Sequence, residues 1–204
     1  DRDFVLAWRP DVGSEPALAA LTETKGETTY ALLMIVPPAA THARTVQPRE
    51  MIYVIDTSGS LGGQSIDQAK AALKNAIGRL TGADRFNILQ FNSWTSSLFP
   101  APVTFSAETR GQALAWIDAL ASTGGPELRD DIRAALAQPA VNGYLRQVVF
   151  LTDGAVAGET TMFTAITQNL GSARLFTVGI GSAPNSNFMR KAAEFGRGTY
   201  THIT

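Results

Sequence analysis

The amino-acid sequence predicts an α/β fold with a doubly wound, mostly parallel central sheet, helices on both faces and one antiparallel edge strand. Two observations lead to this prediction. Apolar runs without a polar break, such as 51–55, alternate along the chain with longer segments whose apolar residues recur at helical spacing. In addition, 45% of the residues are hydrophobic and only 17% are charged, which allows a large buried core. Helices that alternate with buried strands are typical of doubly wound sheets.

The first half of the domain is expected to begin with a buried strand over 51–56. The next segment has one apolar face at helical spacing, formed by Ile66, Ala69, Leu73, Ala76, Ile77 and Leu80. A second strand is expected over 85–91. Pro100 and Pro102 interrupt the following segment, 98–104, and proline cannot donate to a sheet ladder. We therefore expect 98–104 to be the antiparallel edge strand.

The second half repeats this alternation. Helices are expected over 107–121, 127–137, 160–170 and 187–195, and strands over 147–151, 174–178 and 198–203. In the first of these helices the residues expected to face the sheet are Leu114, Ile117, Leu120 and Ala121. Because parallel strands end at the same edge, their carboxyl ends form the edge where open α/β sheets bind ligands.

Three regions are expected along the chain: a short strand in 1–10, a hairpin extension and linker in 11–48, and the α/β domain in 49–204. In the second region, extended runs over 17–24 and 28–36 flank a short turn that contains glycine, which predicts a hairpin. Prolines follow the hairpin and favour a linker.

Three oxygen-bearing side chains follow the strand 51–56. Asp56, Ser58 and Ser60 alternate in a short turn, so one carboxylate and two neutral hydroxyls are expected to lie close together. A small hard cation such as Mg²⁺ takes about six oxygen ligands at about 2.0–2.1 Å and keeps some of them as water. A set with so little negative charge leaves the cation able to attract a further acid. Because Ser and Asp are also favoured helix caps, capping of the next helix is the alternative.

A second acidic loop is expected at the same edge of the sheet. Leu151, Thr152, Asp153 and Gly154 follow the apolar run 148–150. Capping of a helix would explain one oxygen-bearing side chain after one strand. Two acids, Asp56 and Asp153, after two different strands favour a metal site instead. An ordinary Asp-Gly turn is the alternative for Asp153.

The stretch Asp56-Thr-Ser58-Gly-Ser60 after a hydrophobic strand resembles the metal-ion-dependent adhesion site of von Willebrand factor type A (VWA) domains, whose pattern is Asp-x-Ser-x-Ser. The loop around Asp153 is similar to the second acidic loop of this family. The resemblance runs from about residue 30 to the end of the chain and implies a Rossmann-like fold. It also implies that Asp56, Ser58 and Ser60 bind Mg²⁺, Mn²⁺ or Ca²⁺, and that Asp153 holds a metal-bound water. An acidic group of a protein ligand would complete the coordination.

The sequences of segments 65–70 and 84–87 are most similar to those of the subgroup in which this domain follows a vault/inter-alpha-trypsin (VIT) domain, including bacterial surface proteins. This resemblance implies that 1–10 is the last strand of a preceding VIT-like domain, which would be a partner of the α/β domain. It implies a location at the cell surface, or in a periplasmic or extracellular space. A closing helix follows the last strand in the family, and the chain ends at 204 before such a helix.

One position departs from the family pattern. In the subgroup a threonine that binds the metal from a third loop stands directly after a Gly-Gly pair. Here Gly124 and Gly125 are followed by Pro126, which has neither a hydroxyl nor an amide hydrogen. Thr123 and Glu127, on either side, are the candidates for a third-loop contribution. A structural module with a degraded metal site is therefore an alternative function.

Trp94 follows the second strand, so it is expected at the same edge as the metal site. An exposed tryptophan there would form part of the rim of a ligand site, since aromatic residues often dominate binding energy. The alternative is that Trp94 packs over its own hairpin.

Composition excludes several other functions. The chain has no cysteine, which removes disulfides, thiolate metal sites and cysteine nucleophiles. Its net charge is −1 and no basic patch stands out, so nucleic acid is not an expected partner. No stretch approaches the roughly 20 apolar residues of a membrane span.

Enzymatic activity is not expected. Ser58, Asp153 and His202 occur in the chain order of α/β-hydrolases, so a serine hydrolase is a further alternative. The nucleophile elbow of those enzymes has the pattern Gly-x-Ser-x-Gly, however, and Asp56 stands at its first glycine. We therefore predict a metal-dependent adhesion module that acts through protein–protein interaction.

Overall fold

The computed structural model describes residues 15–37, 47–92, 94–123, 136, 141–154 and 159–203. These residues belong to two compact units, Asp1–Val46 and Gln47–Thr204. The strand expected within 1–10 lies outside the described residues, as does the helix expected over 127–137 except for Leu136, which is helical.

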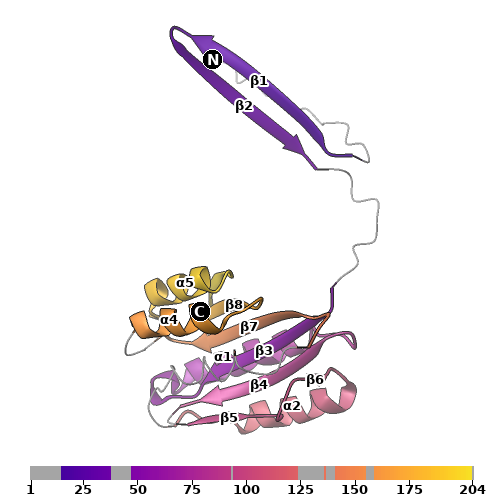
Figure 1. Cartoon of the computed structure of the whole chain (residues 1–204). Coiled ribbons are helices and arrows are strands. Elements are labelled where there is room, and N and C mark those ends of the chain that lie inside the picture. The colour runs from indigo at the N-terminus through magenta and orange to yellow at the C-terminus, as the bar shows by residue number, and fades with distance from the viewer. Residues whose placement is uncertain are drawn as a thin grey trace, which may run out of the picture. The chain divides into compact units, whose positions relative to one another are not determined.

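Strands and helices alternate along the described part of the second unit (Figure 1). The strands are β3 (Arg49–Asp56), β4 (Arg85–Phe91), β5 (Thr95–Ser97), β6 (Val103–Thr104), β7 (Leu145–Thr152), β8 (Arg174–Ile180) and β9 (Tyr200–Ile203). The helices are the 3₁₀ turn η1 (Gly59–Leu61), α1 (Gln64–Ile77), α2 (Ala107–Ala119), α4 (Glu159–Asn169) and α5 (Ser186–Phe195).

The seven strands form one sheet in the order β5-β4-β3-β7-β8-β9, with β6 also paired to β4. The pairs from β4 to β9 are parallel, and both β5 and β6 are antiparallel to β4. The predicted doubly wound, mostly parallel sheet is thus confirmed. The antiparallel strand predicted over 98–104 is present but shorter, because only Val103–Thr104 (β6) pairs with β4 and the prolines at 100 and 102 precede it, while a separate strand, β5, ends at Ser97.

Two apolar clusters cover the two faces of the sheet. One contains Ile166 of α4 and Phe188 of α5, and the other contains Leu73 of α1 and Ile117 of α2. Helix α2 uses a slightly different face from the predicted one, since Ala113 is fully buried whereas Leu114 is only half-buried and Ala121 is exposed. No helix in the described ranges is long and apolar enough to cross a bilayer.

The first unit contains the predicted hairpin, formed by β1 (Ala17–Lys25) and β2 (Thr28–Val36). Residues directly opposite each other share a face, so the register assigns large apolar side chains to both faces. Leu21, Tyr30 and Leu32 lie on one face, and Leu18, Leu33 and Ile35 on the other. Each of these six side chains is at least 58% exposed. The hairpin therefore has two exposed apolar faces.

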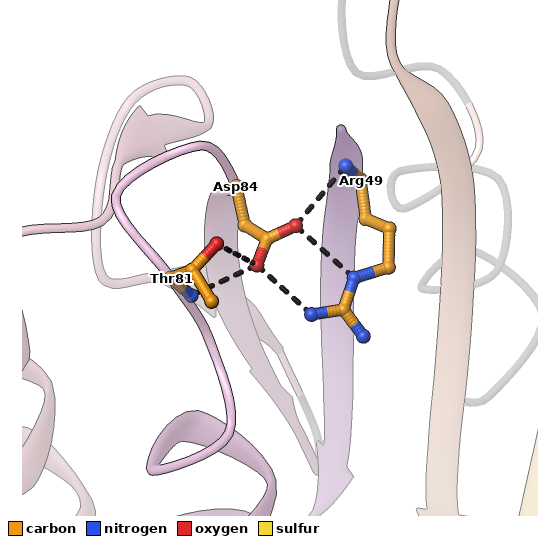
Figure 2. A network of polar contacts seen from close by, with 3 residues as sticks. All are labelled: Arg49, Thr81 and Asp84. Carbon is orange, nitrogen blue, oxygen red and sulfur yellow. Dashed lines mark hydrogen bonds and ion pairs between the residues drawn. The ribbon is translucent and has the colours of Figure 1, made fainter. Parts of the chain in front are cut away.

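A polar network joins the amino-terminal ends of β3 and β4, at the sheet edge opposite to Asp56 (Figure 2). The Arg49 guanidinium donates to both Asp84 oxygens, at 3.0 and 2.9 Å, and the Arg49 backbone N–H donates at 3.1 Å. Thr81 adds a backbone and a hydroxyl hydrogen bond, at 2.8 and 3.0 Å. Burial alone would raise the pKa of Asp84, but these donors outweigh it and lower the pKa to about 2.

This network predicts a loss of stability in acid. Because the folded-state pKa of Asp84 lies below its ordinary value, its contribution is fully present above pH 5 and is lost as the pH falls toward 2. The lowered pKa corresponds to about 2 kcal/mol of unfolding free energy. In urea unfolding, the difference between wild type and Asp84→Asn should narrow from about 2 kcal/mol at pH 6 to below about 1 kcal/mol at pH 2. A difference that stays constant with pH would contradict this account.

A second ionic group is buried near the same edge. Glu50 is 1% exposed, and its Oε1 accepts from Arg146 Nε at 2.7 Å and lies 2.5 Å from Arg146 Nη2. Arg85 Nε lies 3.8 Å from the other carboxylate oxygen. Arg146 itself is 8% exposed, so this carboxylate and its main counter-charge are both withdrawn from water.

Candidate metal centre

The carboxyl ends of three strands meet at one edge of the sheet. Strand β3 lies between β4 and β7, and in the register Asp56 is opposite Phe91 while Ile55 is opposite Leu151. The chain continues from β3 to β4 on one side, whereas β7 adds on the other side. The ends of β3 and β7 therefore form a switch point of the topology, where ligands bind in open α/β sheets.

The Asp56 carboxylate is held in place by hydrogen bonds to both of its oxygens. Its Oδ1 accepts from the Ser58 backbone N–H at 2.8 Å, and its Oδ2 accepts from Thr152 Oγ1 at 2.6 Å. Gly154 N donates in turn to Thr152 Oγ1 at 3.0 Å. Because Asp56 is only 1% exposed, this carboxylate has one orientation fixed by the protein.

The charge on Asp56 is unfavourable in the protein alone. Burial raises the pKa of Asp56 above its ordinary value, and the negative charge of Asp153 raises it further. The hydrogen bonds from Ser58 and Thr152 act in the opposite direction without cancelling these effects. A cation next to the carboxylate would favour its charged form.

The two serine hydroxyls of the turn face each other. Ser58 Oγ and Ser60 Oγ are 3.0 Å apart. Ser58 is the N-cap residue of η1, but its side chain makes no capping hydrogen bond. The N-cap residue of α1 is Gly63, so neither serine caps that helix. The helix-cap alternative for these serines is therefore wrong.

This donor set fits a small hard cation. Two neighbouring ligands that each lie about 2.1 Å from Mg²⁺ in an octahedron are about 3.0 Å apart, which matches the separation of the serine oxygens. Within the described residues, no group of three or more His, Cys, Asp or Glu side chains could hold a metal.

Of the other residues predicted to contribute to the metal site, the structure describes Asp153 and Thr123. The Asp153 side chain is close enough to affect the pKa of Asp56, and its backbone oxygen accepts from Asn185 N at 2.8 Å. Thr123 is exposed, and its backbone N–H donates to the Thr57 oxygen at 2.7 Å, which fixes it next to the Asp-x-Ser-x-Ser turn. Pro126 and Glu127 lie outside the described residues.

Trp94 lies in the loop directly after β4. Its side chain is 61% exposed, so the alternative in which it packs over its own hairpin does not hold. Its backbone is bonded to Asn92, which accepts from Trp94 N through Oδ1 at 3.2 Å and donates its own N–H to the Trp94 oxygen at 3.3 Å.

The residues of the alternative serine hydrolase are not brought together. Ser58 follows β3, whereas His202 lies in β9, three strands away, or about 14 Å at the usual strand spacing. His202 Nε2 contacts the Gly181 carbonyl at 2.9 Å, and Ser58 Oγ contacts Ser60. His202 is therefore not placed to act as a general base for Ser58.

Three residues of the site were not predicted from the sequence. Thr152 orients Asp56, Asn92 is buried beside the turn, and Ser122 Oγ donates to the Ser58 backbone oxygen. Thr152 is the last residue of β7 and Asn92 directly follows β4, and this position at a strand end is the signal that could have identified them. Ser122 has no such signal in the sequence, because its contact with Ser58 depends on where helix α2 ends in space.

Replacing Thr152 by valine should lower stability more than the same change at Thr177. Both threonines are 2% exposed and lie in neighbouring strands, but Thr152 donates to a carboxylate and Thr177 to the neutral Met189 carbonyl at 2.9 Å. Hydrogen bonds to charged groups contribute about 1.5–3 kcal/mol and neutral ones about 1 kcal/mol. We expect losses of about 2 and about 1 kcal/mol in urea unfolding at pH 7 without metal. Equal losses would mean that the Thr152–Asp56 hydrogen bond contributes no more to stability than the neutral Thr177–Met189 hydrogen bond.

The sequence of this chain was compared with protein families and with known proteins. The model of a family described as the von Willebrand factor type A domain matches residues 49–202. A von Willebrand factor A domain-containing protein of Dictyostelium discoideum is 30% identical over the whole chain, which spans 25% of that protein. Human inter-alpha-trypsin inhibitor heavy chain H4 is 28% identical over 73% of the chain and 17% of its own length. The chain thus spans about a quarter or less of the length of these two relatives.

Solved structures share the fold at lower identity. A von Willebrand factor type A structure from Catenulispora acidiphila has a TM-score of 0.70 at 18% identity, covering 97% of this chain and 48% of that one. The manganese-loaded TRAP protein of Plasmodium vivax has a TM-score of 0.59 at 20% identity, covering 77% of this chain and 68% of that one.

Proposed function

The chain belongs to the von Willebrand factor type A domain family, and on that premise we propose that it is a divalent-metal-dependent binding module rather than an enzyme. The observation that carries this proposal is the pair of serine hydroxyls beside the buried Asp56 carboxylate. These hydroxyls do not cap a helix, and their 3.0 Å separation suits two neighbouring ligands of Mg²⁺.

In this proposal Asp56, Ser58 and Ser60 hold Mg²⁺, or Mn²⁺ or Ca²⁺. Bound Mg²⁺ would supply a positive charge that attracts an acidic side chain of a protein ligand. One carboxylate and two neutral hydroxyls cancel only part of a double positive charge, so attraction for another acid remains. Thr152 and the Ser58 backbone orient Asp56 for this role. Asp153 would hold a metal-bound water from the neighbouring strand.

The rim of the site would include Trp94 and Thr123. Trp94 is exposed beside Asn92, and Thr123 is tied to the Thr57 backbone. Glu127 remains a candidate for a third-loop contribution. The hydroxyl of Thr123 and the aromatic ring of Trp94 would suit an acidic residue flanked by apolar groups.

We also propose that the domain works beside a VIT-like domain in a longer protein at the cell surface, or in the periplasm or another extracellular space. The similarity to an inter-alpha-trypsin inhibitor heavy chain supports this context, as do the exposed apolar faces of the β1–β2 hairpin. The manganese-loaded relative of known structure supports the choice of a divalent cation.

A second candidate function is a structural module whose metal site is degraded. The observation that favours it is Pro126, which stands where the subgroup has a metal-binding threonine. A site without that oxygen has one ligand fewer from the protein, and its affinity for Mg²⁺ would be lower.

The experiment that separates these functions is a titration of metal-stripped protein, first with Mn²⁺ and then with a short peptide. Electron paramagnetic resonance should show saturable binding of one Mn²⁺. A Gly-Glu-Gly peptide should then change the spectrum of the bound ion, and the matched Gly-Gln-Gly peptide should not. Binding of Mn²⁺ only after Pro126→Thr would favour the degraded site. Absence of binding in both proteins would refute a metal-dependent function.

A further inference from the structure

Asn92 joins two of the loops at the candidate metal centre, its own loop and that of Thr123. It directly follows β4 and is only 1% exposed. Its Nδ2 donates to Thr123 Oγ1 at 3.3 Å, and its Oδ1 accepts from the Trp94 N–H at 3.2 Å. The two ends of one buried amide are therefore used by two different loops.

Both loops are tied to the Asp-x-Ser-x-Ser turn as well. The N–H and the hydroxyl of Thr57 donate to the Phe91 oxygen, at 2.8 and 3.0 Å, directly before Asn92. Thr123 N donates to the Thr57 oxygen at 2.7 Å. A displacement of the turn or of Thr123 would therefore be transmitted to Asn92 through these hydrogen bonds, and from Asn92 to the Trp94 backbone.

The chemistry of the Thr123 hydroxyl makes it sensitive to a nearby cation. A hydroxyl oxygen has two lone pairs, of which the Asn92 amide occupies one. The other lone pair remains for a cation or for a water bound to it. The contact with Asn92 restricts the rotation of this hydroxyl, and the Thr123 backbone is bonded to Thr57 of the turn, so Thr123 could take the place of the third-loop oxygen that Pro126 lacks.

We propose that Asn92 is a positioning residue that orients the Thr123 hydroxyl toward the metal site and links metal binding to the position of the exposed Trp94. This inference rests on the proposed metal-dependent function and goes beyond it by naming the residue that couples the site to its rim. Binding of Mg²⁺ would then change the surroundings of Trp94, which lies on the surface available to a protein ligand.

The test uses Mg²⁺ titrations of the metal-stripped chain, with affinity measured by calorimetry and the rim by tryptophan fluorescence. Mg²⁺ should change the emission of wild type, and Trp94→Phe should abolish that change, which assigns the signal to Trp94. Asn92→Leu should weaken Mg²⁺ binding about tenfold, as is typical when a residue that orients a ligand is lost, and should also remove the signal. Thr123→Val, at an exposed position, should weaken binding to a similar extent.

Asn87→Leu is the matched control. Asn87 is also a fully buried asparagine and lies in β4, but its side chain bonds to the Phe99 backbone, at 2.9 and 3.1 Å. It should lower stability while leaving both the Mg²⁺ affinity and the Trp94 signal unchanged. The double variant Asn92→Leu/Thr123→Val should bind Mg²⁺ no more weakly than either single variant, because both act through one contact.

The outcomes separate this inference from the proposed function. If Mg²⁺ binds to wild type but the Trp94 emission does not respond, or if Asn92→Leu and Thr123→Val retain wild-type affinity, the role of Asn92 is refuted and the metal site stands. If no Mg²⁺ binds to wild type, both the proposed function and the role of Asn92 are refuted.

Discussion

Replacing Asp56 by alanine is expected to weaken Mg²⁺ binding by at least about 100-fold, since loss of a residue that merely orients a ligand already costs about 10–100-fold. Asp56 is the one carboxylate in the turn, and both of its oxygens are fixed by Thr152 and by the Ser58 backbone. Without it, the two serine hydroxyls carry no charge to hold a cation. Calorimetric titration of the metal-stripped proteins measures this effect.

Asp56→Asn is the control that separates binding from folding. The amide has nearly the shape of the carboxylate, so it keeps the buried volume while removing the charge. Because burial and the charge of Asp153 both oppose ionisation of Asp56, we expect Asp56→Asn to unfold within about 1 kcal/mol of wild type in urea at pH 7. Its Mg²⁺ affinity should fall as far as that of Asp56→Ala. Retained Mg²⁺ affinity in either variant would place the metal site elsewhere.

Replacing Arg146 by methionine is expected to cost about 3–5 kcal/mol of unfolding free energy, the usual result when one partner of a buried ion pair is removed. Methionine fills much of the arginine volume, so the loss comes mainly from the Glu50 carboxylate, which is 1% exposed. The remaining cation, Arg85, lies 3.8 Å from Glu50, beyond hydrogen-bond range. Urea unfolding at pH 7 provides the measurement.

Arg174→Met, in the neighbouring strand β8, is the matched control because Arg174 is exposed. It should change the unfolding free energy by no more than about 0.5 kcal/mol. If Arg146→Met were no more destabilising than Arg174→Met, the buried pair would not contribute to stability as described here.

Much of the fold follows from patterns that are local in the sequence. The uninterrupted apolar run of 51–55 predicted a central strand, and the helical spacing of Ile66, Leu73 and Ile77 predicted the face that α1 buries. Both predictions are confirmed because each depends on burial of a continuous apolar surface. The antiparallel strand expected over 98–104 is shortened to 103–104, because edge pairing depends on which backbone groups the prolines leave free to bond.

The candidate site was only partly predictable, for a physical reason. The residues Asp56, Ser58 and Ser60 stand together in the sequence, so their proximity could be predicted from the turn alone. Asn92, Ser122 and Thr152 reach the same place from separate segments, and their roles depend on hydrogen bonds across the sheet edge. The helix-cap alternative could not be tested from the sequence either, because it depends on where α1 begins.

The hairpin has a practical consequence for experiments on this chain. A two-stranded hairpin is marginally stable alone, and an edge strand with unpaired backbone groups and apolar side chains can recruit other strands. In concentrated solution β1 and β2 are therefore expected to promote self-association of the chain, through contacts between the exposed leucines of the hairpin. A polypeptide that starts at Gln47 retains the sheet and both apolar clusters, and should be the better material for metal titrations and crystallisation.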